Sequence, residues 1–179
     1  MADITITEAL AEIKTIGKRI EKKHEFVLNY LLRQEQFKDP LEREGGSVPT
    51  IQRELQAIRD LHERSVLIRR RINEANMTTR ITINTIERSI ADWLVWKRDV
   101  APGLQKFYQS MDQKINMTRN QAMQKGMVLS SNVEGLKPTD VVVNIDERWL
   151  AQTREQLEAI LGELDGLLSL KNATTMIII

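Results

Sequence analysis

The two histidines are the residues of this chain with the most readily usable chemistry. His24 and His62 fall on two segments that are predicted to pair as an antiparallel helical hairpin turning near Glu44. Both lie at a similar distance from that turn, so their imidazoles could share one layer and serve as a pH-sensitive or metal-binding pair. No third ligand residue is spaced to join them. We therefore favour two structural histidines at the edge of the hairpin seam.

The remaining reactive residues do not form a catalytic pattern. Carboxylates such as Glu155 and Glu158 are typical of a solvated helix face rather than of an acid and base pair. The glycines form neither a phosphate-binding loop nor a dinucleotide motif, and no serine lies in a nucleophile elbow. The chain has no cysteine, which excludes disulfides, thiolate catalysis and cysteine zinc sites. We predict a protein that is not an enzyme and that has no cofactor or metal.

The densest basic run, Arg69–Arg71, does not make a single patch. Consecutive helical residues point in different directions, and acidic residues follow closely in the sequence. Nucleic-acid binding would also require stacking aromatic residues, and aromatic residues make up only 4% of the chain. From Glu134 onward there are eight acidic and four basic side chains, although the whole chain has a net charge of +1. This asymmetry favours head-to-tail contact between copies, or contact with an acidic partner, over binding of nucleic acid.

Three tryptophans, Trp93, Trp96 and Trp149, stand out in a chain with so few aromatic residues. Trp93 and Trp96 are three residues apart and therefore share one helix face. They could close the core where a third helix crosses the hairpin, or they could anchor a partner, because tryptophan is enriched at binding hot spots. Both interpretations stay open at the level of sequence.

The elements that would position these residues begin with a long first helix. Two series of residues spaced by seven interleave along it, namely Ile6, Ile13, Ile20 and Val27, and Leu10, Gly17, His24 and Leu31. Together they form a narrow apolar stripe that is typical of lengthwise helix packing. The helix is predicted to begin at Thr7 and to end near Lys38, before Pro40. A second helix is predicted from about Pro49, with Ile51, Leu55, Ile58, Leu61, Ser65, Ile68, Ile72 and Ala75 on one face.

The rest of the chain predicts further helices and short strands. Residues 79–88 alternate in polarity around Asn84-Thr85, which predicts a β-hairpin, and Ser89 is a helix cap three residues before Asp92. Pro102-Gly103 should kink or break the helix that follows. A strand is predicted at 140–145 and a last helix from about 147 to 170. The predicted fold is mainly α, with segments 1–126 (hairpin and third helix), 127–146 (linker with a strand) and 147–179 (last helix and tail).

The C-terminal tail is uncharged and apolar. Met176, Ile177, Ile178 and Ile179 have strong β preference, so we predict an extended tail that either pairs with Val141–Val143 or docks on a neighbouring molecule. Docking on a neighbour suits an assembly protein better, and these four residues join Trp93 and Trp96 as candidate partner-binding residues. The start of the chain lacks the pattern of a secretion signal, and no apolar run approaches the roughly 20 residues that span a bilayer. These features predict a soluble protein made in a cytoplasm, with no membrane partner.

Short phrases in the chain resemble two groups of proteins. They are Glu8-Ala9-Leu10, Asp39-Pro40, the segment from Arg71 to Thr78, Ser89-Ile90-Ala91-Asp92, Gly162-Glu163-Leu164-Asp165-Gly166-Leu167-Leu168 and Asn172-Ala173-Thr174-Thr175. In these phrases and in the order of its elements the chain resembles septicolysin-like small helical proteins and accessory structural proteins of tailed phages. The toxin-like family name implies membrane activity, but the chain lacks a membrane-inserting segment.

The resemblance implies a bacterial or bacteriophage origin and a non-enzymatic role. The expected function is that of a structural or assembly protein in a bacteriophage virion, in its head, neck or tail, made in the host cytoplasm. It would bind itself as a homo-oligomer and bind other virion structural proteins. The alternatives are a cellular helical interaction protein of the septicolysin-like kind and a nucleic-acid-binding accessory factor.

Overall fold

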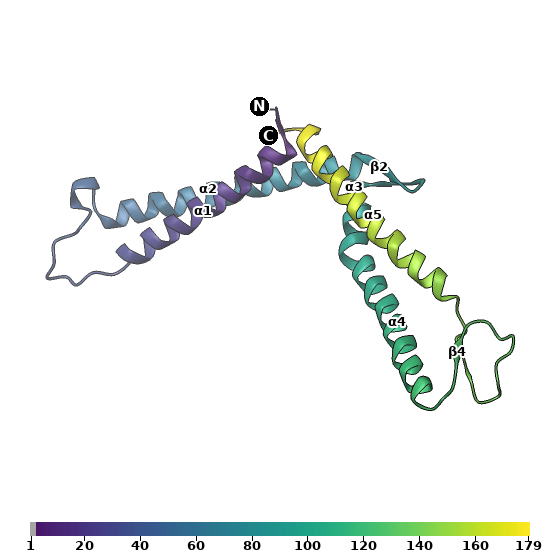
Figure 1. The fold of residues 1–179 in the computed structure, drawn as a ribbon. Helices are drawn as coiled ribbons and strands as arrows, with labels where there is room; N and C mark the ends of the chain where they lie inside the picture. Colours follow the sequence, from purple (N-terminus) through teal and green to yellow (C-terminus); the bar gives the residue numbers. More distant parts are fainter. Residues whose placement is uncertain (1–2) are drawn as a thin grey trace. The chain divides into compact units, whose positions relative to one another are not determined.

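The computed structural model describes residues 3–179, which fold into two units dominated by helices (Figure 1). Unit 1 comprises the described residues up to Thr78 together with Ser169–Ile179, and unit 2 comprises Thr79–Leu168. The predicted mainly α fold is confirmed. In the described range, no helix is long and apolar enough to cross a membrane.

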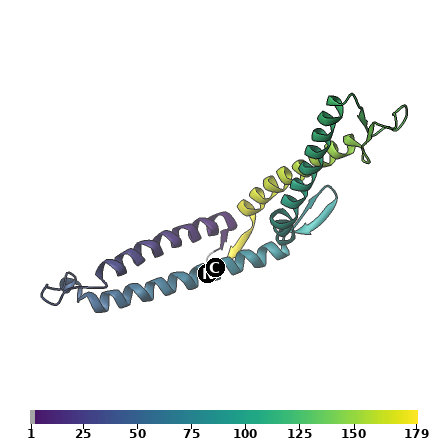
Figure 2. The same cartoon turned by 90° about the horizontal axis from the view of Figure 1, so that it is seen from below.

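Unit 1 is built on the predicted antiparallel hairpin of α1 (Ile6–Tyr30) and α2 (Ser47–Thr78), whose helices lie side by side (Figure 2). Thr5, rather than Thr7, caps α1, because its side chain accepts from the Glu8 N–H while the Glu8 carboxylate accepts from the Thr5 N–H. The predicted end of this helix at Lys38 is wrong by eight residues. Residues 31–46 form the connection to α2, which begins at Ser47.

The seam between α1 and α2 uses the first predicted series and replaces the second. Ile6, Ile20 and Val27 are buried and Ile13 packs against them, as predicted. The second series in the seam is Ala9, Ile16 and Lys23, one position earlier than the predicted Leu10, Gly17 and His24. The seam therefore alternates in steps of three and four residues, as a two-stranded coiled coil requires.

The α2 side of the seam follows the prediction with one exchange. The buried or half-buried residues that follow the seam spacing are Ile51, Glu54, Ile58, Leu61, Ser65, Ile68, Ile72 and Ala75. Glu54 takes the position that was assigned to Leu55, and its carboxylate lies 2.6 Å from Lys23 Nζ. A charged pair can occupy this layer because both side chains stay partly exposed to water.

One carboxylate organises the connection between the two helices, which contains the short 3₁₀ helix η1 (Glu42–Glu44). Asp39 accepts hydrogen bonds from the backbone N–H groups of Leu41 and Ser47, at 2.9 and 2.8 Å, and from the Ser47 hydroxyl. These bonds, led by that of the Ser47 hydroxyl, lower the pKa of Asp39. The ionised carboxylate therefore holds the start of α2 in place.

The predicted extended tail is instead a paired strand. The strand β6 (Met176–Ile178) is antiparallel to β1 (Asp3–Thr5), with Ile177 opposite Ile4. Ile177 is buried in the core of the α1/α2 hairpin, and Ile4 and Ile179 pack against the same core. The tail thus pairs with the first strand of its own chain rather than with Val141–Val143, and it closes one end of unit 1.

Unit 2 begins with the predicted β-hairpin of β2 (Arg80–Ile83) and β3 (Ile86–Ser89). Its turn residues Asn84 and Thr85 both have positive φ angles, as a tight two-residue turn demands. Ser89 caps α3 (Ile90–Val95) as predicted, since its hydroxyl accepts from the Asp92 N–H at 3.0 Å. The core below this hairpin contains Ile81, Ile83, Ile90, Trp93 and Leu164.

Of the predicted kink or break at Pro102-Gly103, the break is wrong, because the helix continues past Pro102. α3 continues through the π-helical turn η2 (Trp96–Val100) into α4 (Ala101–Gln124). In this turn the Ala101 N–H bonds to the Trp96 carbonyl, five residues back. The wider turn accommodates Pro102, which lacks an N–H and whose ring would otherwise clash with the carbonyl four residues before it.

The predicted strand at 140–145 is shorter than expected. β5 (Val141–Val142) pairs in parallel with β4 (Leu129–Ser130), and the last helix, α5, runs over Glu147–Thr174. The Asp140 carboxylate accepts from the N–H groups of Val128 and Lys137 and so ties both ends of the loop together. These bonds lower the pKa of Asp140, that of the Val128 N–H most.

Candidate functional site

The two sides of the α1/α2 seam differ in chemistry. One side carries a groove of about 500 Å³, which we call the open side. The groove is lined by Ile13, Ile16, Gly17, Ile20, Glu21 and His24 of α1 and by His62, Ser65, Val66 and Arg69 of α2. On the other side, Arg64 Nε lies 3.0 Å from a Glu12 carboxylate oxygen and forms an ion pair across the seam. The described residues that line the open side therefore form no ion pair between the two helices, whereas Glu12 and Arg64 form one on the opposite side.

Exposed apolar side chains extend the open side along both helices. Leu10 and Leu31 lie seven residues from Gly17 and His24 and so belong to the same column of α1. Leu10 is 46% exposed and Leu31 is 54% exposed. On α2, Leu55 lies seven residues before His62, and Val66 is 61% exposed beside it. This is the predicted second series of α1, and it faces outward from the seam rather than into it.

The predicted histidine pair lies at the groove. His24 and His62 both line the open side, from α1 and α2 respectively, and both are exposed. Within residues 3–179, no group of three or more His, Cys, Asp or Glu side chains is placed to hold a metal ion. The structure thus places both imidazoles along one groove, where they form part of a mainly apolar lining, while their sharing of a single layer stays a prediction.

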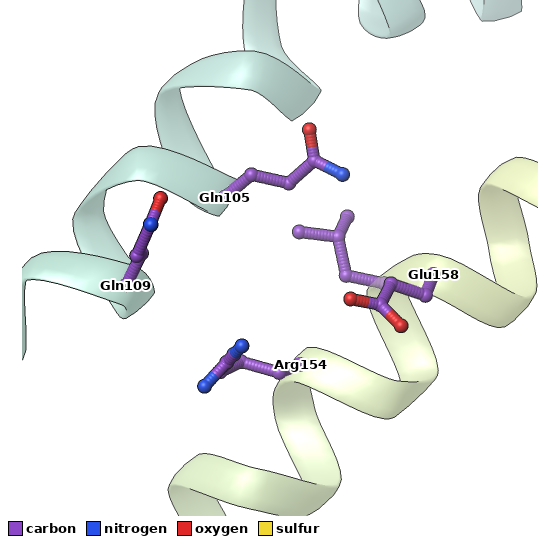
Figure 3. A pocket seen from close by; sticks show the side chains of 5 residues that line it. Gln105, Gln109, Arg154 and Glu158 are labelled. Atoms are coloured by element: carbon purple, nitrogen blue, oxygen red, sulfur yellow. The ribbon is translucent and has the colours of Figure 1, made fainter. Parts of the chain in front are cut away.

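A second cleft lies between α4 and α5 in unit 2 and has a different character (Figure 3). It measures about 310 Å³ and is lined by Gln105, Gln109, Arg154, Leu157 and Glu158. The Arg154 guanidinium lies 3.1 Å from the Asp112 carboxylate, so its charge is already compensated. The cleft is the polar edge of a helical seam, and it offers amide groups for hydrogen bonding and a carboxylate exposed to water.

The ion pairs of unit 2 continue along the same edge. Arg119 of α4 pairs with Glu147 at the start of α5, and Lys97 of η2 pairs with Asp165. All of these side chains remain substantially exposed, so each pair contributes only about 0–1 kcal/mol to stability. The cleft between α4 and α5 is thus bordered by charges that bridge the two helices, whereas the open side of the α1/α2 seam carries exposed apolar side chains.

The two candidate tryptophans occupy the core of unit 2. Trp93 is 2% exposed, and its indole N–H donates to the Ile81 carbonyl at 3.3 Å. Trp96 is half-buried and packs edge-on against Trp93, with ring centroids 5.5 Å apart. Arg88 lies over the Trp93 ring at 5.0 Å. Trp93 therefore has no free surface to offer, while Trp96 presents a partial one.

The four candidate tail residues divide between the two faces of β6. Ile177 is buried and Ile179 packs against the core of unit 1, while Met176 and Ile178 are exposed. Trp149, the third tryptophan, is also exposed and makes an edge-on contact with Tyr108. Within unit 1, none of the four tail residues lines the groove on the open side of the α1/α2 seam.

The exposed positions Leu55 and Val66 were not selected from the sequence as site residues. The available signal was the column Leu10, Gly17, His24 and Leu31, which is apolar enough to be assigned to the seam. A comparison with the neighbouring column would have shown that Ile16 is a larger apolar residue than Gly17. A helix with two adjacent apolar columns buries one in its own fold and leaves the other for a further contact.

Comparisons with known proteins give a fold but no family. No protein-family model matches the chain, and no curated protein matches it. Among solved structures, the chain is similar to a functionally unknown conserved protein from Corynebacterium diphtheriae. The two are 17% identical, the alignment covers 99% of this chain and 100% of the other, and the TM-score is 0.57. At this identity the match shows a shared fold alone.

Proposed function

We propose that this protein is a non-enzymatic structural or assembly component that acts through helix packing. One observation carries the proposal, namely the second apolar column on the open side of the α1/α2 hairpin. Leu10, Leu31, Leu55 and Val66 keep between about two fifths and three fifths of their surface exposed, although the seam beside them is closed. Exposed apolar residues that are spread along two helices beside a groove of mainly apolar lining are typical of a surface that binds another protein.

Burial of this surface supplies part of the free energy that association needs. Complete burial of a Leu or Val side chain stabilises by about 1.5–3 kcal/mol, so covering the exposed half of each contributes roughly 1 kcal/mol. Four such residues and the groove floor supply several kcal/mol. Association also costs translational and rotational freedom, estimated at about 4–15 kcal/mol, so contacts beyond these four residues must contribute. A surface of this strength favours assembly in which many weak contacts repeat.

The setting that we propose is a bacteriophage particle, where the protein would contact itself and other virion structural proteins. This part of the proposal is supported by the short phrases that resemble accessory structural proteins of tailed phages. The same phrases support a cellular helical interaction protein of the septicolysin-like kind as the alternative. Because β6 is paired within its own chain, the proposal relies on the helical hairpin and not on a free tail.

A mass-spectrometric protein list of purified virions tests the proposal. We expect the chain in the particle at a copy number comparable to that of a head, neck or tail component. Genes for capsid, portal and tail proteins beside its own gene would agree with this result. Absence of the chain from purified virions, together with neighbouring genes of cellular metabolism, would reject the phage setting.

A further inference from the structure

We infer that the open side of the α1/α2 hairpin binds a second copy of this chain, with the two hairpins antiparallel and a twofold axis beside Gly17. The inference rests on the proposed function, because it names the first partner of the same surface. It concerns unit 1 only, and it depends on charge complementarity that the surface has with itself.

Two opposite charges on α1 lie at similar distances on either side of Gly17. Lys14 precedes Gly17 by three residues and Glu21 follows it by four, and both side chains are exposed. Glu21 lines the groove, and Lys14 lies seven residues before it in the same column. An antiparallel twofold arrangement therefore sets Lys14 of each copy opposite Glu21 of the other, whereas a parallel one sets like charges together.

The shape of the open side agrees with the same axis. Gly17 has no side chain, and an added Cβ would meet nothing within 4 Å, so two α1 helices can approach closely at this point. Ile13 and Ile20 on either side of it supply an apolar floor to the groove. Leu10 and His24 lie seven residues before and after Gly17, so the exposed Leu10 of one copy would be covered near His24 of the other.

We place the middle of the α2 half of the groove near the level of Gly17, because residues 13–24 of α1 and 62–69 of α2 line the same groove. Val66 and Ser65 lie at its middle, and His62 and Arg69 lie at its two ends. The antiparallel arrangement brings the exposed Val66 side chains of the two copies together. It also sets His62 of one copy opposite Arg69 of the other, and a neutral imidazole nitrogen can accept a hydrogen bond from a guanidinium. No pair of like charges in the groove is thus forced together.

Because the chain has no cysteine, a single engineered thiol reports directly on the axis. We expect the Gly17→Cys variant to form a disulfide-linked dimer under mild oxidation, since a disulfide needs Cα atoms within about 7 Å. The matched control is Lys18→Cys, the next residue on the same helix, which is exposed but points in a different direction. Crosslinking at both positions at equal rates would indicate random collision and would overturn the inference.

A charge exchange tests the pairing without changing the shape of the groove. Lys14→Glu and Glu21→Lys should each weaken dimerisation about tenfold or more, measured by sedimentation equilibrium at low salt, because each sets like charges opposite one another. The double variant K14E/E21K should restore most of the affinity. Both positions are exposed, so the variants should keep the far-UV circular dichroism of the parent protein.

The possible results separate this inference from the proposed function. A protein that stays monomeric at all accessible concentrations, or a double variant that does not recover, overturns the twofold surface. If the chain is nevertheless present in purified virions, the proposed function stands and its open side binds a different virion protein. If Gly17→Cys crosslinks but virions lack the chain, the dimer stands and the phage setting fails.

Discussion

The strand β6 allows a comparison of two identical side chains on adjacent residues. Ile177 is 5% exposed in the core of unit 1, and Ile178 is 53% exposed on the opposite face of the strand. Replacing Ile177 by Ala removes about three carbon atoms from the core, which at roughly 0.8 kcal/mol each costs about 2.5 kcal/mol. The cavity left behind adds to this value, and large-to-small core substitutions of this kind cost about 2–5 kcal/mol. Because β6 lies at an end of the hairpin, where neighbours can move in, we expect about 2.5–3.5 kcal/mol.

The assay is urea unfolding of Ile177→Ala and Ile178→Ala beside the parent protein, followed by far-UV circular dichroism. With a urea dependence of about 1–3 kcal/mol per molar, Ile177→Ala should lower the midpoint by about 1 M or more. Ile178→Ala should change the stability by less than about 0.5 kcal/mol, as an exposed substitution usually does. Equal shifts for the two variants would refute the packing of β6 on unit 1 and would revive docking of the tail on a neighbouring molecule.

Three further outcomes are expected. Ile20→Asp should lower the free energy of unfolding by several kcal/mol in thermal melts, because it buries an unpaired charge. Arg70→Ala should change it by less than about 0.5 kcal/mol, because Arg70 is exposed. Equal effects would mean that the helix faces assigned to the seam are wrong. The pKa of Asp39 is lowered in the fold, so its contribution to stability is present above its unfolded pKa and is lost as pH falls below about 4. The protection factor of the Ser47 amide, the ratio of its intrinsic to its observed hydrogen-exchange rate at each pH, should therefore fall over that range, and Asp39→Asn should abolish this fall. Thr85→Gly should stabilise unit 2 by about 1 kcal/mol in thermal melts, because Thr85 has a φ of +66°, and a lower melting temperature would contradict the turn geometry.

The sequence predicts the hairpin well because the apolar residues of its seam recur at a regular spacing. The column from Ile6 to Val27 and the column from Ile51 to Ala75 identify the two helices and their antiparallel pairing. What the spacing does not decide is which of two adjacent columns completes the α1 seam. Leu10 and Ala9 are both apolar, so the choice depends on how α1 is rotated against α2, and only the three-dimensional structure shows that rotation.

The partner of the tail was beyond the reach of local patterns. Ile177 is strongly β-forming, which predicts an extended segment, but its partner β1 is only three residues long and lies at the other end of the chain. A segment of three residues is too short to show a periodic pattern of apolar residues. The predicted end of α1 at Lys38 is wrong for a related reason. Pro40 sets a limit that the helix could not pass, but it does not show that the helix ends earlier, at Tyr30.

The candidate site was only partly visible in the sequence. The sequence identifies the residues of its α1 column as a group. It assigns them to internal packing, however, whereas in the structure they face outward and are available for contact with another molecule. Trp93 shows the opposite case, because a residue type that is common at binding hot spots is enclosed here by the core of unit 2. Exposure, which separates these two uses, depends on contacts between segments far apart in the chain.

The pairing of β1 with β6 makes unit 1 discontinuous along the chain, with residues 79–168 inserted between its two parts. On the ribosome, α1 and α2 emerge first but cannot be sealed until residues 176–178 have been synthesised. All of unit 2 is available for folding before that moment. Interrupted translation would therefore release a chain whose first hairpin lacks its closing strand and exposes Ile4 and its neighbours. The stability of the first hairpin therefore depends on a segment that is synthesised after the whole of unit 2.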